Sequence, residues 1–145
     1  MSYDQLKLSN QLCHPLYSAA NALVRAYGPL LGPLDLTYPQ YIIMMALWEQ
    51  DGVNIKQLSE VSFFDSGSLT PLLTRLLDKG LIKTTPVPED KRQKLIHLTK
   101  KGEKLRAEAA KIPELMVCQL GISMSEIALL KKLTEKLHAG LVVET

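Results

Sequence analysis

The sequence contains few cysteines, few aromatic residues and little net charge. Of its 145 residues, 2 are cysteine and 6% are aromatic, and the formal net charge is +2. Two cysteines are too few for the disulfide framework of a small secreted protein. The chain also has no apolar run of membrane-spanning length, and its start, MSYDQLKLSNQL, lacks the basic-then-apolar order of a signal peptide. We therefore expect a cytoplasmic protein that does not enter a membrane.

Residues typical of active sites and metal centres are scattered. His14, His97 and His138 are far apart, and the sequence has neither a phosphate-binding glycine run nor clustered metal-ligand spacing. With 46% hydrophobic and 22% charged residues, the chain has the composition of one globular domain with a real core. We therefore expect neither an enzyme nor a bound metal or organic cofactor.

Residues 54–98 carry the clearest pattern: a helix, a turn, a second helix and a hairpin. The first of these helices is expected to begin after Asn54, with Gln57 as its capping partner. In the second helix, leucines recur at the spacing of one buried face, at Leu69, Leu72, Leu73, Leu76 and Leu77. The candidate DNA-binding residues lie off that face and at its start: Asp65, Ser66, Ser68, Thr70, Thr74 and Arg75. Small hydroxyls approach bases without bulk, and arginine donates to guanine or phosphate. Taken alone, the helix also fits an ordinary solvated surface.

The start of this second helix contains a conflict. If Asp65 caps the helix, Pro71 lies past the first turn, where it removes one backbone hydrogen bond and crowds the carbonyl of Gly67. A start at Ser68 would remove the conflict. We expect an irregular first turn.

The hairpin favours DNA binding over the solvated surface. Gly80 stands where a C-terminal cap belongs, and two short apolar strands, at 81–82 and 95–98, flank the tip 86–92. Residues 75–111 hold 11 basic and 5 acidic side chains, whereas the segments before and after have net charges of −3 and −1. Positive charge concentrated on one segment suits phosphate binding. The pattern predicts a winged helix-turn-helix.

Two helical segments precede this stretch. Helical spacing covers residues 3–31, with an interruption at Pro15 and an end near Gly28. The next helix starts with a capping box of Thr37 and the Gln three residues later, and it runs through apolar residues 41–48 to a stop at 51–52. Because it is apolar nearly all round, we expect this helix to be buried.

Two more helices are predicted after the hairpin. Thr99 caps a helix towards Cys118 with a kink at Pro113, and a last helix runs from Ser123 to near Gly140. The expected fold is mainly α, with about six helices and a β-hairpin wing.

The domain division follows from these elements. We expect a single domain, 1–145, in which residues 37–111 form the winged helix-turn-helix and its flanking helices. The terminal segments, 1–36 and 112–145, are apolar on one face and are expected to pack against the same segments of a second chain. A homodimer also fits DNA, because two recognition helices one duplex turn apart match a palindromic operator.

The wing resembles that of the MarR family of transcription regulators. That family's wing has an Asp-x-Arg pair, a short strand and Leu-Thr, which here are Asp90, Arg92, Leu98 and Thr99. Both arginines are expected on exposed, locally basic surfaces. We therefore expect Arg75 to contact the major groove of double-stranded DNA, and Arg92, oriented by Asp90, to contact the minor groove or its phosphates from the wing.

Most of the chain resembles one branch of that family, the organic hydroperoxide resistance regulators (OhrR). The similarity runs through QLCHPLYSAANALVRAYGPLLGPLDLTYPQY and DSGSLTPLL. It implies a peroxide-sensing repressor in which tyrosines at 27 and 38 hydrogen-bond the thiolate of Cys13. Cys118 would then close a disulfide between subunits. Tyr17, one turn from Cys13, is a third candidate, and His14 stands where the family often has an apolar residue.

Several alternatives remain open at this stage. In a continuous helix Cys13 and Tyr27 share a face but lie roughly 21 Å apart, so the tyrosine comes from a partner chain unless the helix turns at Pro15. Pro15 either starts the first helix or kinks it. The alternative role of the two cysteines is that of inert core residues, and the alternative role of the tyrosines is to fill space at the dimer interface. A MarR-type repressor released by a small phenolic ligand, and a thiol peroxidase, are the alternative functions.

Overall fold

Most helices begin directly after a residue whose side chain caps them. The capping boxes of Thr37 with Gln40, Asn54 with Gln57, and Ser123 with Glu126 are all formed, and each satisfies two backbone N–H groups. Thr99 likewise accepts a hydrogen bond from the Gly102 N–H. The helix starts predicted from these four caps are therefore confirmed.

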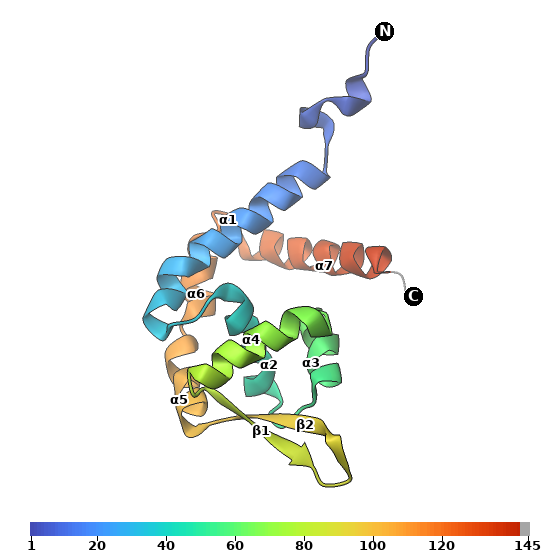
Figure 1. The fold of residues 1–145 in the computed structure, drawn as a ribbon. Helices are drawn as coiled ribbons and strands as arrows, with labels where there is room; N and C mark the ends of the chain where they lie inside the picture. The colour runs from blue at the N-terminus through green and yellow to red at the C-terminus, as the bar shows by residue number, and fades with distance from the viewer. Residues whose placement is uncertain (143–145) are drawn as a thin grey trace. The chain divides into compact units, whose positions relative to one another are not determined.

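The structure is a computed structural model and describes residues 1–142 (Figure 1). The chain divides into two units, one of residues 1–113 and one that begins at residue 114. The helices of the first unit are α1 (Cys13–Leu31), α2 (Tyr38–Glu49), α3 (Ile55–Ser62), α4 (Ser66–Asp78) and α5 (Lys100–Ala109). Its strands are β1 (Ile82–Val87) and β2 (Asp90–Leu98). Helix α6 (Ile112–Val117) crosses the boundary, and α7 (Met124–Leu141) lies in the second unit.

The apolar residues of α2 form the centre of the first unit. Ile43, Met44 and Leu47 are fully buried, as the apolar run of this helix predicted. Leucines of α4 complete the core from one side, with Leu69 and Leu76 fully buried. Leu77 is 39% exposed, so it lies outside the buried face that the leucine spacing predicted.

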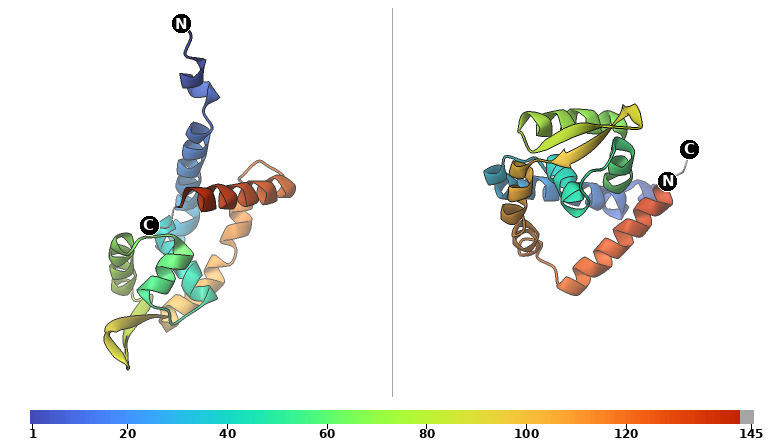
Figure 2. Two further views of the ribbon diagram at one scale, coloured as in Figure 1. Left: turned by 90° about the vertical axis from the view of Figure 1, so that its right-hand side faces the viewer. Right: turned by 90° about the horizontal axis from the view of Figure 1, so that it is seen from below.

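The antiparallel wing is longer than the two apolar segments suggested. Ile82 pairs with Leu98, and the pairing continues outward to Val87 with Asp90, with an irregularity after Pro86. The charged tip is therefore part of the strands, because backbone pairing extends beyond the buried residues. Figure 1 and the left view of Figure 2 place this hairpin and the N-terminus at opposite ends of the first unit.

Helix α4 is continuous despite Pro71. The Ser68 N–H donates to Asp65 Oδ1 at 2.6 Å, and the helix begins at Ser66, so the alternative start at Ser68 is wrong. At the other end, Gly80 has a φ of 70° and the Leu81 N–H donates to the Leu76 carbonyl, the Schellman arrangement. Both ends of this helix are thus set by local sequence.

The predicted first helix differs from the observed one at both ends. Residues 4–10 form two short 3₁₀ turns, and α1 begins only at Cys13. Pro15 lies in its first turn, where the backbone N–H that proline lacks would have no helical partner. The helix then passes Pro29 and ends at Leu31, three residues beyond the expected end at Gly28.

A kink at Pro113 within one helix was expected, but two separate helices are observed. Helix α5 stops at Ala109, four residues before Pro113, and α6 starts afresh at Ile112. A proline clashes with the carbonyl four residues earlier, so a single helix through Ala109 is disfavoured.

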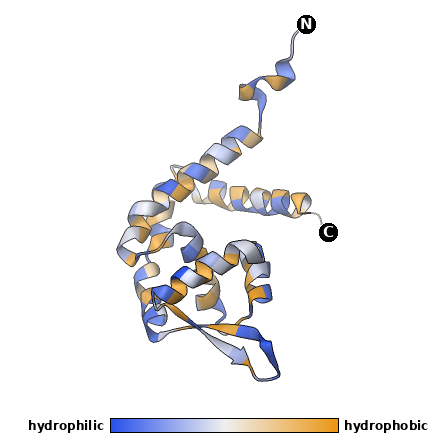
Figure 3. Ribbon diagram, in the orientation of Figure 1, coloured by the Kyte–Doolittle hydropathy of each residue, from blue (hydrophilic) through white to orange (hydrophobic). Residues whose placement is uncertain are grey.

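Apolar side chains remain exposed on α1 and α7. On α1 they include Tyr17, Leu23 and Val24, and on α7 Leu129, Leu130, Leu133, Leu137 and Leu141. Helix α7 has no buried residue, although hydrophobic and hydrophilic residues alternate along it (Figure 3). No helix among residues 1–142 is long and apolar enough to cross a membrane.

Candidate functional site

The exposed face of α4 carries the residues expected to contact DNA. Ser66, Ser68, Thr70, Thr74 and Arg75 are all exposed, and Asp65 caps the helix at its start. Hydrogen bonds from the Ser68 backbone hold the pKa of the Asp65 carboxyl below its usual value. Asp65 therefore stays ionised at neutral pH, and its first role is to fix the helix end.

The two threonines of this face have their hydroxyl protons engaged. Thr70 Oγ1 donates to the Ser66 carbonyl at 3.0 Å, and Thr74 Oγ1 donates to the Thr70 carbonyl at 2.9 Å. Each threonine then offers a methyl group and hydroxyl lone pairs to a ligand. Methyl groups pack against thymine, and lone pairs accept from base amino groups, so this surface suits a major groove.

At the wing tip, Asp90 contacts the backbone N–H of Arg92. The Arg92 N–H donates to Asp90 Oδ1 at 3.0 Å, and both residues are exposed. Asp90 thus shapes the backbone of the tip and leaves the Arg92 guanidinium available for an outside partner. Lys83, Lys91 and Lys94 are exposed on the same hairpin and add positive charge.

A short segment before α3 holds the base of the wing. Val53 and Ile96 form an isolated antiparallel bridge, in which the backbone N–H of each residue donates to the carbonyl of the other. Asp51 Oδ1 accepts from the Leu98 N–H at 2.8 Å. The wing is therefore positioned by α2–α3 residues that the sequence did not single out, because such a one-residue pairing has no periodic signal.

Cys13 is exposed and is the first residue of α1. The open question about Pro15 is thereby answered: the helix starts at Cys13, with the proline in its first turn. A helix N-terminus carries partial positive charge from unpaired N–H groups, which favours an anion there. Because α1 is unbroken, Tyr27 lies roughly 21 Å from Cys13 along the axis, at about 1.5 Å per residue.

Tyr27 and Tyr38 meet at the other end of α1. Their rings stack with centroids 4.5 Å apart, although the residues belong to different helices. Tyr41 lies 5.9 Å from Tyr27 and 6.4 Å from Tyr38, and Trp48 extends the cluster from Tyr41 at 6.5 Å. Sequence reasoning missed Tyr41, though its place one turn after Tyr38 on α2 was a usable signal.

Burial changes the acidity of all three tyrosines in the cluster. Desolvation raises the pKa of Tyr27, Tyr38 and Tyr41 above the ordinary value, and the neighbouring rings add to this for Tyr27 and Tyr41. Their hydroxyls therefore remain protonated at neutral pH and are able to donate hydrogen bonds. Tyr17, in contrast, is 71% exposed and lies outside the cluster.

Cys118 belongs to the second unit. It is exposed, and its N–H donates to the Glu114 carbonyl at 3.1 Å just after the end of α6. No cluster of three or more metal-ligating residues is present within residues 1–142.

Comparisons with known proteins identify the family. Residues 25–109 match the family model described as transcriptional regulator SarA/Rot. The chain is also 40% identical over 136 residues to the organic hydroperoxide resistance transcriptional regulator of Bacillus subtilis (strain 168), covering 94% of this chain and 90% of the relative. The chain belongs to the MarR family of transcriptional regulators.

Solved structures agree with this MarR-family assignment. Reduced AbfR bound to DNA has a TM-score of 0.82 and 28% identity, covering 97% of this chain and 96% of that one. Overoxidised AbfR bound to DNA has a TM-score of 0.76 and 28% identity, over 97% and 100% of the two chains. AbfR comes from Staphylococcus epidermidis. This MarR-family chain is thus a DNA-binding transcriptional regulator and not an enzyme.

The MarR-family site residues fall into separate groups in one chain. The α4 face and the wing supply the DNA-contacting candidates, and the stacked pair of Tyr27 and Tyr38 lies at the end of α1 away from Cys13. The single chain therefore brings the two tyrosines together, but does not bring Cys13 to either of them.

Proposed function

We propose that this protein is a peroxide-sensing repressor that binds a palindromic operator as a homodimer. Oxidation of Cys13 by an organic hydroperoxide releases it from DNA, and a disulfide with Cys118 of the second chain completes the switch. The likeness to the regulator of B. subtilis, whose name refers to organic hydroperoxide resistance, supports this sensing role. In this proposal the chain is a single domain, in which residues 37–111 bind DNA and residues 1–36 and 112–145 form the dimer contacts.

The position of Cys13 on α1 is the observation that carries the proposal. An exposed thiol at the start of a straight helix is open to a peroxide, and the helix end favours negative charge. The protonated hydroxyls of Tyr27 and Tyr38 are suitable donors to a thiolate, but they lie about 21 Å further along the same helix. The complete sensing site therefore requires the tyrosines of a second copy of the chain.

The exposed apolar residues support a homodimer. Five leucines of α7, and Tyr17, Leu23 and Val24 of α1, are exposed in the part of the chain that the structure describes. A surface helix with such a face is stabilised by burial against another element. A second copy meets this need and also brings a second α4 to the operator, in the spacing that a palindrome demands.

The chemistry needs only the two thiols and the peroxide. The Cys13 sulfur attacks one peroxide oxygen, the O–O bond breaks, and the other oxygen leaves as an alcohol, which gives a sulfenic acid. The Cys118 sulfur of the second chain then attacks that sulfur, and water leaves as the disulfide forms. Because disulfide geometry keeps Cα atoms within about 7 Å, bond formation moves helices and changes the spacing of the two α4 helices.

Non-reducing denaturing gels test the pairing of the two thiols. Peroxide-treated wild type should migrate as a covalent dimer with two bridges, and a thiol reductant should return it to monomer. Cys13→Ser should give no covalent dimer. Cys118→Ser should form the sulfenic acid and then pass to sulfinic and sulfonic acids, which mass spectrometry detects.

An intrachain disulfide would give a different result on the gel. Oxidised wild type that migrates only as monomer, with no free thiol left, would show an intrachain bond and refute the intersubunit one.

A further inference from the structure

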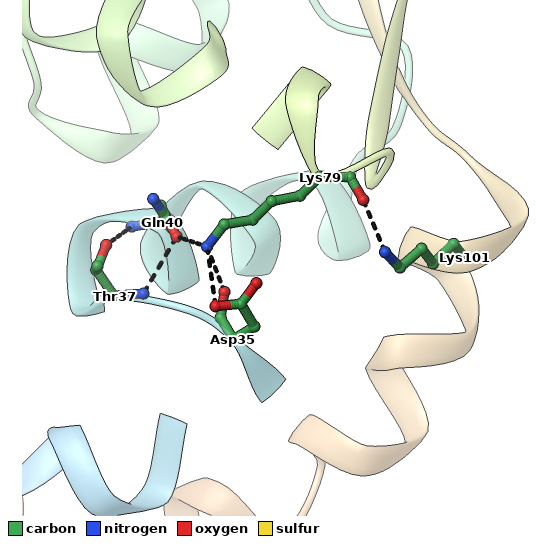
Figure 4. A network of polar contacts seen from close by, with 5 residues as sticks. All are labelled: Asp35, Thr37, Gln40, Lys79 and Lys101. Atoms are coloured by element: carbon green, nitrogen blue, oxygen red, sulfur yellow. Dashed lines mark hydrogen bonds and ion pairs between the residues drawn. The ribbon is translucent and has the colours of Figure 1, made fainter. Parts of the chain in front are cut away.

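Lys79 joins the C-terminal end of the recognition helix to the start of α2. It is the residue directly after α4, and its ammonium donates to the backbone carbonyl of Asp35 and, at 2.9 Å, to Oε1 of Gln40 (Figure 4). The Asp35 carboxylate lies 3.6 Å from the same nitrogen. Lys101 Nζ donates to the Lys79 carbonyl at 2.8 Å and so ties the start of α5 to the same point.

Local contacts at the start of α2 hold the two acceptors of Lys79, the Asp35 carbonyl and Gln40 Oε1, in place. Gln40 is only 2% exposed, and its Oε1 also accepts from the Thr37 N–H within the α2 capping box. Asp35 has a φ of 55°, a conformation that few residues other than glycine adopt, and it turns the carbonyl towards the ammonium. The Asp35 carboxylate is mostly exposed, so its ion pair adds little and the two oxygen acceptors hold the lysine.

The first turn of α2 thus has two neighbours from distant parts of the chain. On one side Tyr38, the first residue of α2, stacks on Tyr27 of α1. On the other side Gln40, two residues later, holds Lys79 of the recognition helix. A displacement of this turn reaches α4 through a partly buried hydrogen bond.

We propose that Lys79 is a positioning residue that transmits movement of the α1–α2 junction to the recognition helix. The inference rests on the proposed redox function, in which the thiol of a second copy acts at Tyr27 and Tyr38. In the reduced protein, Lys79 holds α4 at the angle that matches the operator. On oxidation, the shifted first turn of α2 pulls the C-terminal end of α4 through Lys79 and Gln40.

Operator affinity before and after complete oxidation of Cys13 tests this coupling. Wild type should lose affinity by roughly 5- to 150-fold, the usual range of allosteric coupling. In Lys79→Met the fold-change should shrink to about threefold or less, with Cys13 oxidised to the same extent by mass spectrometry. Lys79→Arg, which keeps a cationic donor, should restore most of the coupling. Lys104→Met, which removes an exposed ammonium of α5, is the matched charge control and should behave as wild type.

The ratio of the operator affinities of reduced and oxidised protein distinguishes coupling from a merely structural role of Lys79. A structural role would lower the affinities of reduced and oxidised Lys79→Met alike and leave their ratio unchanged, which would overturn the proposal. Should Lys79→Met fail to fold, Lys79→Gln is measured with the same two outcomes. A wild type whose affinity does not change on oxidation would refute the redox function itself, and the transmission with it.

Discussion

Gly102 allows α5 to approach the wing more closely than any other residue type permits. A Cβ at this position would lie 2.1 Å from the Leu81 carbonyl oxygen, which also accepts from the Thr99 N–H. The Gly102 carbonyl in turn accepts from Trp48 Nε1 at 2.9 Å. At the scale of single residues, this glycine joins α2, α5 and the wing at one buried point.

Gly102→Ala should therefore destabilise the fold. The backbone of Leu81 or of α5 has to shift, and overpacking of this kind costs about 1–3 kcal/mol of unfolding free energy. Urea denaturation measures the change. Gly28→Ala is the matched control, because its added Cβ meets no atom within 4 Å among the described residues, and alanine favours a helix by roughly 0.5–1 kcal/mol. Equal stability of Gly102→Ala and wild type would contradict the close approach.

Single residues also mark the limit of what the sequence predicted. Cys13, Tyr27 and Tyr38 were identified through a family resemblance, because an isolated cysteine or tyrosine has no periodic signal. Lys79 and Tyr41 were missed for the same reason. Their importance depends on contacts between segments that are distant in the sequence, and only the folded chain provides those contacts.

At the scale of elements, helix starts were predictable and the effects of prolines were not. A capping side chain acts within four residues, so Thr37, Asn54 and Ser123 revealed their helices directly. A proline has different effects according to its position. Pro15 and Pro113 lie in the first turns of α1 and α6, whereas Pro71 lies inside α4.

Pro71 should weaken α4 relative to alanine. It lies six residues into the helix, where its ring nitrogen cannot donate to the Gly67 carbonyl. Pro71→Ala should raise the unfolding free energy by up to about 3 kcal/mol, reduced by the greater freedom of the unfolded chain. Pro39→Ala on α2 should bring no such gain, because a first-turn N–H has no helical partner. A Pro71→Ala protein that melts below wild type would show that the proline stabilises the helix start.

The wing should act on DNA through its free guanidinium. Arg92→Ala should cost roughly 1–3 kcal/mol of operator binding and flatten the salt dependence, because a cationic contact is lost. Fluorescence anisotropy at several salt concentrations measures both effects. Arg106→Ala removes an equivalent charge from α5, where Arg106 lies 3.7 Å from Glu103, and should change binding far less. Unchanged affinity and salt slope in Arg92→Ala would remove the wing from the interface.

At the scale of the whole molecule, the winged helix-turn-helix followed from sequence periodicity and local charge. Leucine spacing, Gly80 and the basic hairpin are local features, and each predicted its element correctly. The use of the terminal helices did not follow in the same way. Their exposed leucines support the proposed dimer, in which a second copy of the chain would cover them.

Operator binding before and after oxidation is the most direct test of the sensing role. Reduced wild type should bind a palindromic operator, lose that binding on addition of an organic hydroperoxide such as cumene hydroperoxide, and regain it with a thiol reductant. Cys13→Ser should bind equally well in the reduced state and show no response to the peroxide. A Cys13→Ser protein that the hydroperoxide releases as readily as wild type would contradict the role of Cys13 as the sensor.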